Sequence, residues 1–212
     1  MWDGHDGEMW DGRDEVAILF PMQIIYHTLI PALWCLWLAV WVIWAFRTKR
    51  VVRAESVGSR VSHFVPLGLG ILLLSSSSFA GHWLSMRLYV QTPWTFWCGT
   101  ALVAIGLGHA VWARAHLAGN WSGTVTLKQD HSLTRSGPYG LTRHPIYTGI
   151  LTAVLGSAIA EAEWRGYLAL VLITAAFLRK ISIEEGFLTS QFGDAYARYR
   201  AEVPALIPWL HW

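Results

Sequence analysis

Five apolar segments, joined by short polar connections, occupy most of this 212-residue chain. They run approximately over residues 18–46, 64–84, 94–112, 146–160 and 166–178. A helix needs roughly 20 apolar residues to cross about 30 Å of hydrocarbon, so the last two segments are short. A composition of 54% hydrophobic and 14% charged residues also fits membrane helices better than an ordinary soluble domain. The sequence therefore predicts an all-α, polytopic membrane protein with about five transmembrane helices.

The charges that flank the first apolar segment predict its orientation. Acidic residues precede the segment, whereas basic residues crowd the connection after it: Arg47, Lys49, Arg50, Arg53 and Arg60. Because Lys and Arg accumulate on the cytoplasmic side, the N-terminus is expected outside. The first 17 residues are acidic where a signal peptide would be positive, so none is predicted. Five spans then place residues 113–145 and 179–212 in the cytoplasm.

The chain shows no internal repeat or long linker, so we expect one domain over residues 1–212. Residues 1–112 form a three-span scaffold in this interpretation, and residues 113–212 carry the motifs described next. Aromatic residues at helical spacing after the last span predict a C-terminal cytoplasmic amphipathic helix: Phe187, Phe192, Tyr196 and Tyr199. Both cysteines lie inside predicted spans, so no metal site is expected. No nucleic-acid partner is expected either.

Arg143, His144 and Pro145 lie at the start of the fourth apolar segment. Proline suits the first position of a helix and disfavours helical geometry in the residue before it, so we expect His144 at the N-cap. The unpaired N–H groups and the positive dipole of such a helix end can hold an anion, and the guanidinium of Arg143 would reinforce them. A carboxylate fits there. Simple anchoring at the membrane interface is the alternative.

Glu184 and Glu185 follow the last apolar segment. Ionised carboxylates accept hydrogen bonds only, so the pair could hold hydroxyl groups or an ammonium group. A surface ion pair between Lys180 and Glu184, which are four residues apart, is the alternative. If the Arg143-His144-Pro145 motif and the Glu184-Glu185 pair meet on the cytoplasmic side, they could together bind a zwitterionic cofactor at the membrane surface.

Five motifs in the second half of the chain occur in an informative order. They are Asn120-Trp121-Ser122, His-Ser-Leu-Thr-Arg-Ser-Gly-Pro-Tyr at 131–139, Arg-His-Pro-Ile-Tyr-Thr-Gly at 143–149, Glu184-Glu185, and Phe-Gly-Asp-Ala-Tyr at 192–196. In order and spacing they resemble the isoprenylcysteine carboxyl methyltransferases. The resemblance covers roughly residues 117–208, less than half of the chain.

The resemblance implies a polytopic methyltransferase that binds S-adenosylmethionine on the cytosolic side and takes a lipophilic substrate from the bilayer. Carried over position by position, the cofactor contacts would be His131, Ser132, Leu133, Thr134, Tyr139, His144, Pro145, Ile146, Tyr147 and Glu184. We add Arg143 and Glu185 on the physical grounds given above. The family places a basic residue, usually Arg, near the substrate carboxylate; here that position is Lys180, with Arg179 beside it.

The acceptor is less well defined than the cofactor, because lysine cannot offer a carboxylate the bidentate fork of arginine. A prenylcysteine carboxylate is already a competent nucleophile, so no catalytic base is required and alignment of donor and acceptor suffices. A phospholipid amine or a small thiol is the alternative acceptor. Such an acceptor must lose a proton, and His109, His131 or a nearby Glu would then be candidate bases.

Two other function classes stay open on the sequence alone. Membrane sterol-type reductases have a loosely similar C-terminal region that binds NADPH. The phosphates of NADPH favour more basic residues than this tail carries, and Glu184 and Glu185 would repel them. A membrane protein without catalytic activity is the other alternative.

Overall fold

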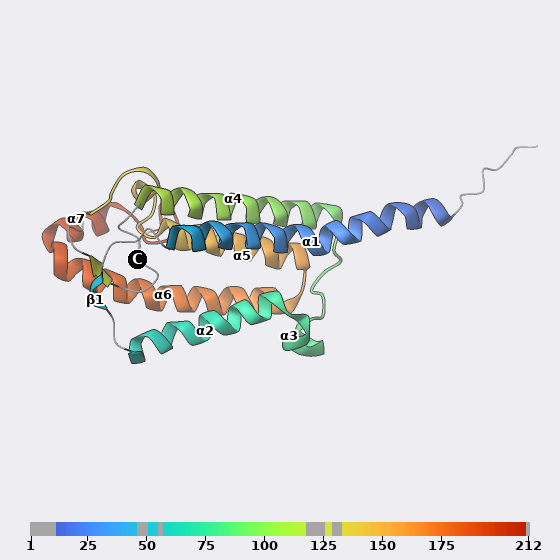
Figure 1. The fold of residues 1–212 in the computed structure, drawn as a ribbon, viewed down its shortest axis with the longest axis horizontal. Helices are drawn as coiled ribbons and strands as arrows, with labels where there is room; N and C mark the ends of the chain where they lie inside the picture. The colour runs from blue at the N-terminus through green and yellow to red at the C-terminus, as the bar shows by residue number, and fades with distance from the viewer. Residues whose placement is uncertain (1–11, 46–50, 55–56, 118–125, 129–132, 211–212) are drawn as a thin grey trace, which may run out of the picture.

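The computed structural model describes residues 12–45, 51–54, 57–117, 126–128 and 133–210. Its long helices are α1 (Gly12–Ala45), α2 (Val57–Ser75), α4 (Pro93–Leu117), α5 (Pro145–Glu161) and α6 (Trp164–Phe192). The short elements are α3 (Ser77–Leu84), the 3-10 helix η2 (Gly137–Gly140), α7 (Asp194–Glu202), and strands β1 (Val51–Ala54) and β2 (Thr126–Lys128), which pair antiparallel. Figure 1 shows the long helices lying along one axis, with α7 and the strand pair at one end.

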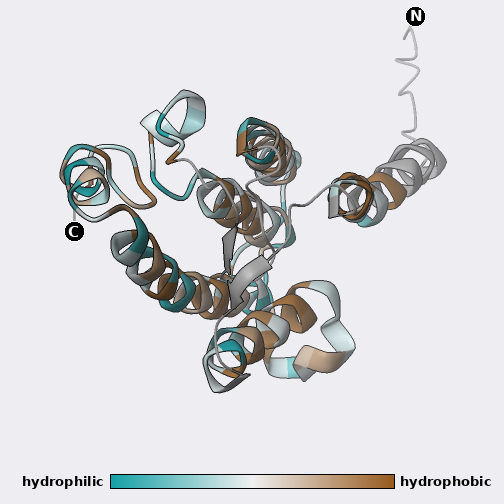
Figure 2. Ribbon diagram, turned by 60° about the vertical axis from the view of Figure 1, so that its left-hand side comes forward, coloured by the Kyte–Doolittle hydropathy of each residue, from teal (hydrophilic) through white to brown (hydrophobic). Residues whose placement is uncertain are grey.

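Four of the described helices, α1, α2, α4 and α6, contain stretches long and apolar enough to cross a membrane, and α5 is a shorter apolar helix. The 17 residues of α5 extend about 25 Å at 1.5 Å per residue. Figure 2 shows hydrophobic residues along the long helices and hydrophilic residues on α7. The predicted class, an all-α integral membrane protein with about five spans, is confirmed.

Two predicted segment boundaries are wrong. The segment predicted over 64–84 is divided, because α2 ends at Ser75 and Ser76 caps α3 by accepting a hydrogen bond from the Phe79 amide. The segment predicted over 166–178 is too short, because α6 continues without interruption to Phe192. Glu184 and Glu185 therefore lie on the same rigid helix as the last apolar span.

The predicted C-terminal amphipathic helix is present as α7, after a break at Gly193, whose φ is +49°. Its aromatic residues Tyr196 and Tyr199 are buried in a cluster with Val203. Leu133, Leu188 and Phe192 pack against this cluster. The apolar face of α7 therefore packs against the protein itself.

Helices α4 and α5 cross antiparallel at unusually close range. A Cβ atom added to Gly106 would lie 2.4 Å from the Gly149 carbonyl oxygen, and one added to Gly99 would lie 2.4 Å from that of Gly156. Small residues let membrane helices approach until their backbones touch, which maximises van der Waals contact where lipid provides no hydrophobic driving force. This crossing fixes the start of α5, and with it the position of His144.

The other long helices surround this pair. The Trp34 indole of α1 donates to the Ser157 hydroxyl of α5 at 3.1 Å, and the Arg114 guanidinium of α4 donates to the Trp44 carbonyl at 3.1 Å. On the other side, α2 packs antiparallel against α6, with Gly70 in close contact with Ile173. The site residues lie at the end of the bundle where α4 ends and α5 begins, next to the C-terminal part of α6.

Candidate functional site

Helix α5 begins at a short turn that the sequence specifies locally. Pro138 starts the 3-10 helix η2, and Pro145 occupies the first helical position after His144, which is the N-cap as predicted. The backbone amides of Arg143 and His144 donate to the carbonyls of Pro204 and Ala205 at 2.8 and 3.0 Å. The turn before α5 is therefore held by a segment close to the C-terminus.

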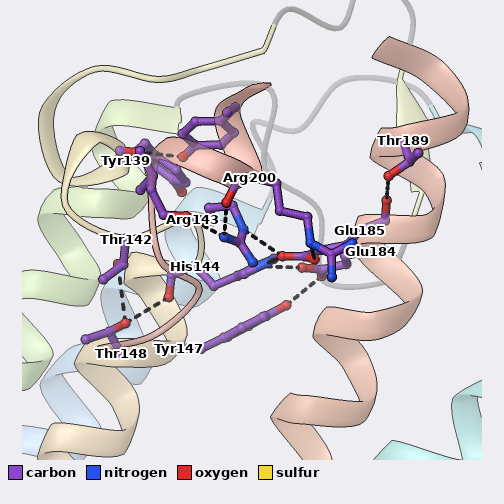
Figure 3. Close-up of polar contacts among 12 residues, drawn as sticks. Tyr139, Thr142, Arg143, His144, Tyr147, Thr148, Glu184, Glu185, Thr189 and Arg200 are labelled. Carbon is purple, nitrogen blue, oxygen red and sulfur yellow. Dashed lines mark hydrogen bonds and ion pairs between the residues drawn. The ribbon is translucent and has the colours of Figure 1, made fainter. Parts of the chain in front are cut away.

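The Arg143 side chain connects three parts of the site and is only 3% exposed. Its Nε donates to Glu185 Oε1 at 2.8 Å, and its Nη1 donates to the Arg200 carbonyl at 3.1 Å and to the Val203 carbonyl. Arg143 thereby links Glu185 of α6 to the end of α7 and the residue that follows it (Figure 3). Its predicted contact with a cofactor stays a prediction.

The His144 ring lies between the two carboxylates of α6. Its Nδ1 is 3.4 Å from Glu184 Oε2, and its Nε2 is 3.2 Å from Glu185 Oε1. Burial lowers the pKa of His144, but hydrogen bonds and charge from both glutamates outweigh burial and raise this pKa above its ordinary value. Both ring nitrogens face acceptors, so the doubly protonated imidazolium fits this environment.

Glu184 and Glu185 have different surroundings although they are adjacent. The Glu185 side chain is 9% exposed and contacts Arg143, His144 and, at 3.5 Å, Arg200 Nε. The Glu184 side chain is 21% exposed and accepts a 2.6 Å hydrogen bond from the Tyr147 hydroxyl. Glu185 is therefore buried among cationic groups, whereas Glu184 is partly exposed, and the predicted contacts of both with a cofactor stay predictions.

Tyr147 connects the charged residues to the membrane-embedded core. Its ring stacks on His144 at 5.6 Å and on Phe177 at 4.6 Å between centroids. The Lys180 ammonium lies 5.5 Å from the centroid of the same ring. The Lys180 ammonium, the Tyr147 hydroxyl and the Glu184 carboxylate therefore lie close together. They are next to the apolar contact between the Tyr147 and Phe177 rings.

The remaining predicted site residues divide into four groups. Tyr139 and Ile146 are buried together with Ala113, and burial, followed by the charge of Glu184, raises the pKa of Tyr139. Leu133 packs against the α7 cluster, and Thr134 is half-buried. The Arg179 Nε contacts the Ser62 hydroxyl of α2 at 3.3 Å. His131 and Ser132 lie outside the described residues.

Sequence reasoning missed the segment that closes this arrangement. Residues 203–206, which we call the strap, are buried and follow α7. Its carbonyl groups accept from Arg143, His144 and Thr148, whose hydroxyl donates to the Leu206 carbonyl at 2.7 Å. In the sequence, Pro204 and Pro208 mark only a place where a helix cannot continue. Backbone carbonyl groups exist at every position, so no side-chain pattern marked these as site groups.

The shifted pKa of His144 predicts a pH-dependent contribution to stability. A pKa raised in the folded state means that the contribution is fully present below the unfolded value of 6.5 and is lost as pH rises through the folded value. We expect the Tm difference between the wild type and His144→Gln to be largest at acidic pH and to shrink as pH increases. Thermal unfolding across a pH series measures it, and a difference that grows with pH contradicts the assignment.

The arrangement can bind a zwitterion but is not built to remove a proton. Glu184 can accept from an ammonium or hydroxyl groups, and the N-terminus of α5 with Lys180 supplies positive potential for an anion. His144 already faces a carboxylate from each ring nitrogen. Among the described residues, no group of three or more His, Cys, Asp or Glu side chains could hold a metal ion.

Comparisons with known proteins identify the same part of the chain. Residues 94–195 match the phospholipid methyltransferase family. The chain is 37% identical over 81 residues to a protein-S-isoprenylcysteine O-methyltransferase of Schizosaccharomyces pombe, a match that covers 38% of this chain and 34% of that protein. It is 29% identical over 142 residues to the cobalt-zinc-cadmium resistance protein CzcN of Cupriavidus metallidurans, covering 66% of this chain and 58% of that protein.

A third relative, methanethiol S-methyltransferase 1 of Bradyrhizobium diazoefficiens, is 36% identical over 72 residues, covering 34% of this chain and 24% of that protein. The chain thus spans less than two thirds of the length of these relatives. The matched family segment runs from α4 into α7 and includes Arg143, His144, Glu184 and Glu185. This segment is similar to the phospholipid methyltransferase family, and over a shorter stretch the chain is similar to a protein-S-isoprenylcysteine O-methyltransferase.

Proposed function

We propose that this protein is a membrane methyltransferase that transfers a methyl group from S-adenosylmethionine to a lipophilic acceptor, the carboxylate of a prenylcysteine-type substrate. The observation that carries the proposal is the place where the start of α5 faces residues 180–185 of α6. There the partly accessible Glu184, the helix N-terminus at His144 and the Lys180 ammonium lie together next to the apolar contact between Tyr147 and Phe177. The similarity to the phospholipid methyltransferase family and to a protein-S-isoprenylcysteine O-methyltransferase independently supports methyl transfer.

The donor groups present fit such a cofactor. The Glu184 carboxylate can accept from its α-ammonium or ribose hydroxyl groups, and the amides at the start of α5 can hold its carboxylate. When bound, the cofactor supplies an electrophilic methyl group on a positively charged sulfur. Tyr147 and Glu184 orient the ligand. The buried Arg143–Glu185 pair holds the start of α5 at a fixed position relative to α6.

The state of His144 supports a carboxylate acceptor. Both nitrogens of this imidazole face a carboxylate, and hydrogen bonds to these carboxylates raise the pKa of His144, so neither nitrogen is directed toward a proton of an acceptor. A carboxylate acceptor has no proton to lose, whereas an amine or thiol does. Small thiols and phospholipid amines nevertheless remain the second candidates, because the name of one relative specifies methanethiol and the matched family is described by phospholipids.

A binding experiment tests the cofactor. Purified wild-type protein in detergent is expected to bind S-adenosylhomocysteine but not NADPH by calorimetry. Glu184→Gln is expected to weaken binding roughly ten- to hundredfold, since a charge-assisted hydrogen bond contributes about 1.5–3 kcal/mol. Lys180→Ala is expected to keep this affinity and to raise the KM for a prenylcysteine analogue. Arg198→Ala, an exposed charge change on α7, is the control.

Three outcomes of this experiment would be decisive. Saturable NADPH binding without a response to S-adenosylhomocysteine would overturn the methyltransferase assignment. Methylation of a phospholipid amine or a small thiol, with none of a prenylcysteine carboxylate, would overturn the acceptor only. An equal loss of cofactor affinity in Lys180→Ala and Glu184→Gln would contradict the proposal that Glu184 binds the cofactor while Lys180 binds the acceptor.

The orientation and the division of the chain are also proposals. The basic connection after α1 supports a cytoplasmic site, with residues 1–112 as scaffold and residues 113–212 as the catalytic region of one domain. A cysteine introduced at Gly7 is expected to react with an impermeant reagent added to intact cells. A cysteine introduced at Lys128 is expected to react only after permeabilisation. The opposite pattern would invert the orientation.

A further inference from the structure

An exposed apolar turn follows the strap. Residues 207–210, which we call the tip, read Ile-Pro-Trp-Leu and are closed by a hydrogen bond from the Leu210 amide to the Ile207 carbonyl at 3.1 Å. The Ile207, Trp209 and Leu210 side chains are 54%, 92% and 51% exposed. Three large apolar side chains therefore project from one short turn, immediately after the buried segment that closes the site.

The backbone of Trp209 makes this exposure unusual. Its φ is +67°, in the left-handed region that bulky L-residues rarely adopt. Such a conformation normally persists because surrounding contacts offset its cost. Among the residues that the structure describes, a side chain that is 92% exposed makes few contacts that could offset this cost. A contact between Trp209 and the surroundings of the protein would offset it.

The position of the tip relative to the helices indicates what surrounds it. Leu206, the residue before the tip, accepts a hydrogen bond from Thr148, the fourth residue of α5. The tip thus begins level with the first turn of an apolar helix. Trp112, which is 48% exposed, lies in the last turns of α4, which ends at the same end of the bundle. Trp side chains favour this level of a membrane, where the ring contacts both acyl chains and headgroups.

We propose that the tip inserts into the interfacial layer of the lipid bilayer and thereby holds the strap over the site. The strap accepts hydrogen bonds from the Arg143 and His144 amides, from the Arg143 guanidinium and from the Thr148 hydroxyl. Lipid that holds Trp209 in place consequently also holds in place the strap carbonyl groups that accept hydrogen bonds from Arg143 and His144. This inference concerns a lipid contact and does not depend on the proposed methyl transfer.

Depth measurements test the lipid contact. Cys35 and Cys98 are replaced by Ala, one new cysteine is introduced and spin-labelled, and the protein is placed in phosphatidylcholine nanodiscs. A label at Trp209→Cys is expected to collide more with oxygen than with a water-soluble nickel chelate. Ile105→Cys, on the exposed middle of α4, marks the bilayer interior, and Arg198→Cys, on exposed α7, marks water. Nickel accessibility at position 209 equal to that at 198 would overturn the proposal.

A second measurement tests the coupling to the strap. Trp209→Gly removes the disfavoured φ, so it should increase order if Trp209 has no external partner. With a lipid partner, Trp209→Gly instead increases hydrogen exchange at the Arg143 and His144 amides several-fold in nanodiscs. Trp209→Tyr, which keeps an interfacial aromatic ring, restores protection. Unchanged or slower exchange in Trp209→Gly would refute the coupling.

Discussion

Gly106→Ala is expected to prevent stable folding, whereas Gly108→Ala, two residues further along the same helix, is expected to be tolerated. The added Cβ at Gly106 would lie 2.4 Å from the Gly149 carbonyl oxygen and 2.6 Å from the Ala153 amide nitrogen. Both are backbone atoms and cannot move aside without separating α4 from α5. We expect destabilisation of about 3 kcal/mol, the upper end of typical overpacking costs.

Gly108 is a matched control because a Cβ added there meets nothing within 4 Å. Alanine costs less conformational entropy than glycine in a helix, so Gly108→Ala should be neutral or stabilising by up to about 1 kcal/mol. Thermal unfolding followed by fluorescence size-exclusion chromatography in one detergent measures both variants. Equal melting temperatures would show that α4 and α5 are not in backbone contact at this point.

Arg143→Ala is expected to cost about 3–5 kcal/mol of stability, because it leaves a buried glutamate without its main cation. Glu185 is only 9% exposed, and its remaining cationic neighbours are His144 and the exposed Arg200. The same change removes two hydrogen bonds to carbonyl groups of residues 200 and 203. We expect a lower Tm together with loss of S-adenosylhomocysteine binding.

A double variant separates the stability effect from the binding effect. Arg143→Gln with Glu185→Gln removes both charges together and should recover much of the lost Tm, since neither partner is left as an isolated buried charge. Arg143→Lys keeps the charge but cannot reproduce the fork, so an intermediate Tm is expected. If the double variant is less stable than Arg143→Ala, the buried pair does not explain the loss.

The start of α5 shows what local sequence determined. Pro145 restricts both itself and His144, so the N-cap followed from two adjacent residues without reference to the rest of the chain. The apolar segments likewise predicted membrane helices, because hydrocarbon accepts only backbone whose polar groups are paired internally. Their limits were less accurate, as the break at Ser76 and the continuation of α6 to Phe192 depend on packing and capping.

The motifs at 143–144 and 184–185 could be selected from the sequence, but only the tertiary structure distinguished the two glutamates. Glu185 is buried because Arg143, 42 positions earlier, extends across to it, whereas Glu184 faces Tyr147 and remains partly accessible. The hydrogen bonds of the strap and the Gly106–Gly149 contact could not be predicted from the sequence either. Sequence determined which segments become helices and which side chains carry charge. The different surroundings of Glu184 and Glu185 were decided only by the fold, since burial and hydrogen-bond partners arise from residues that are distant along the chain.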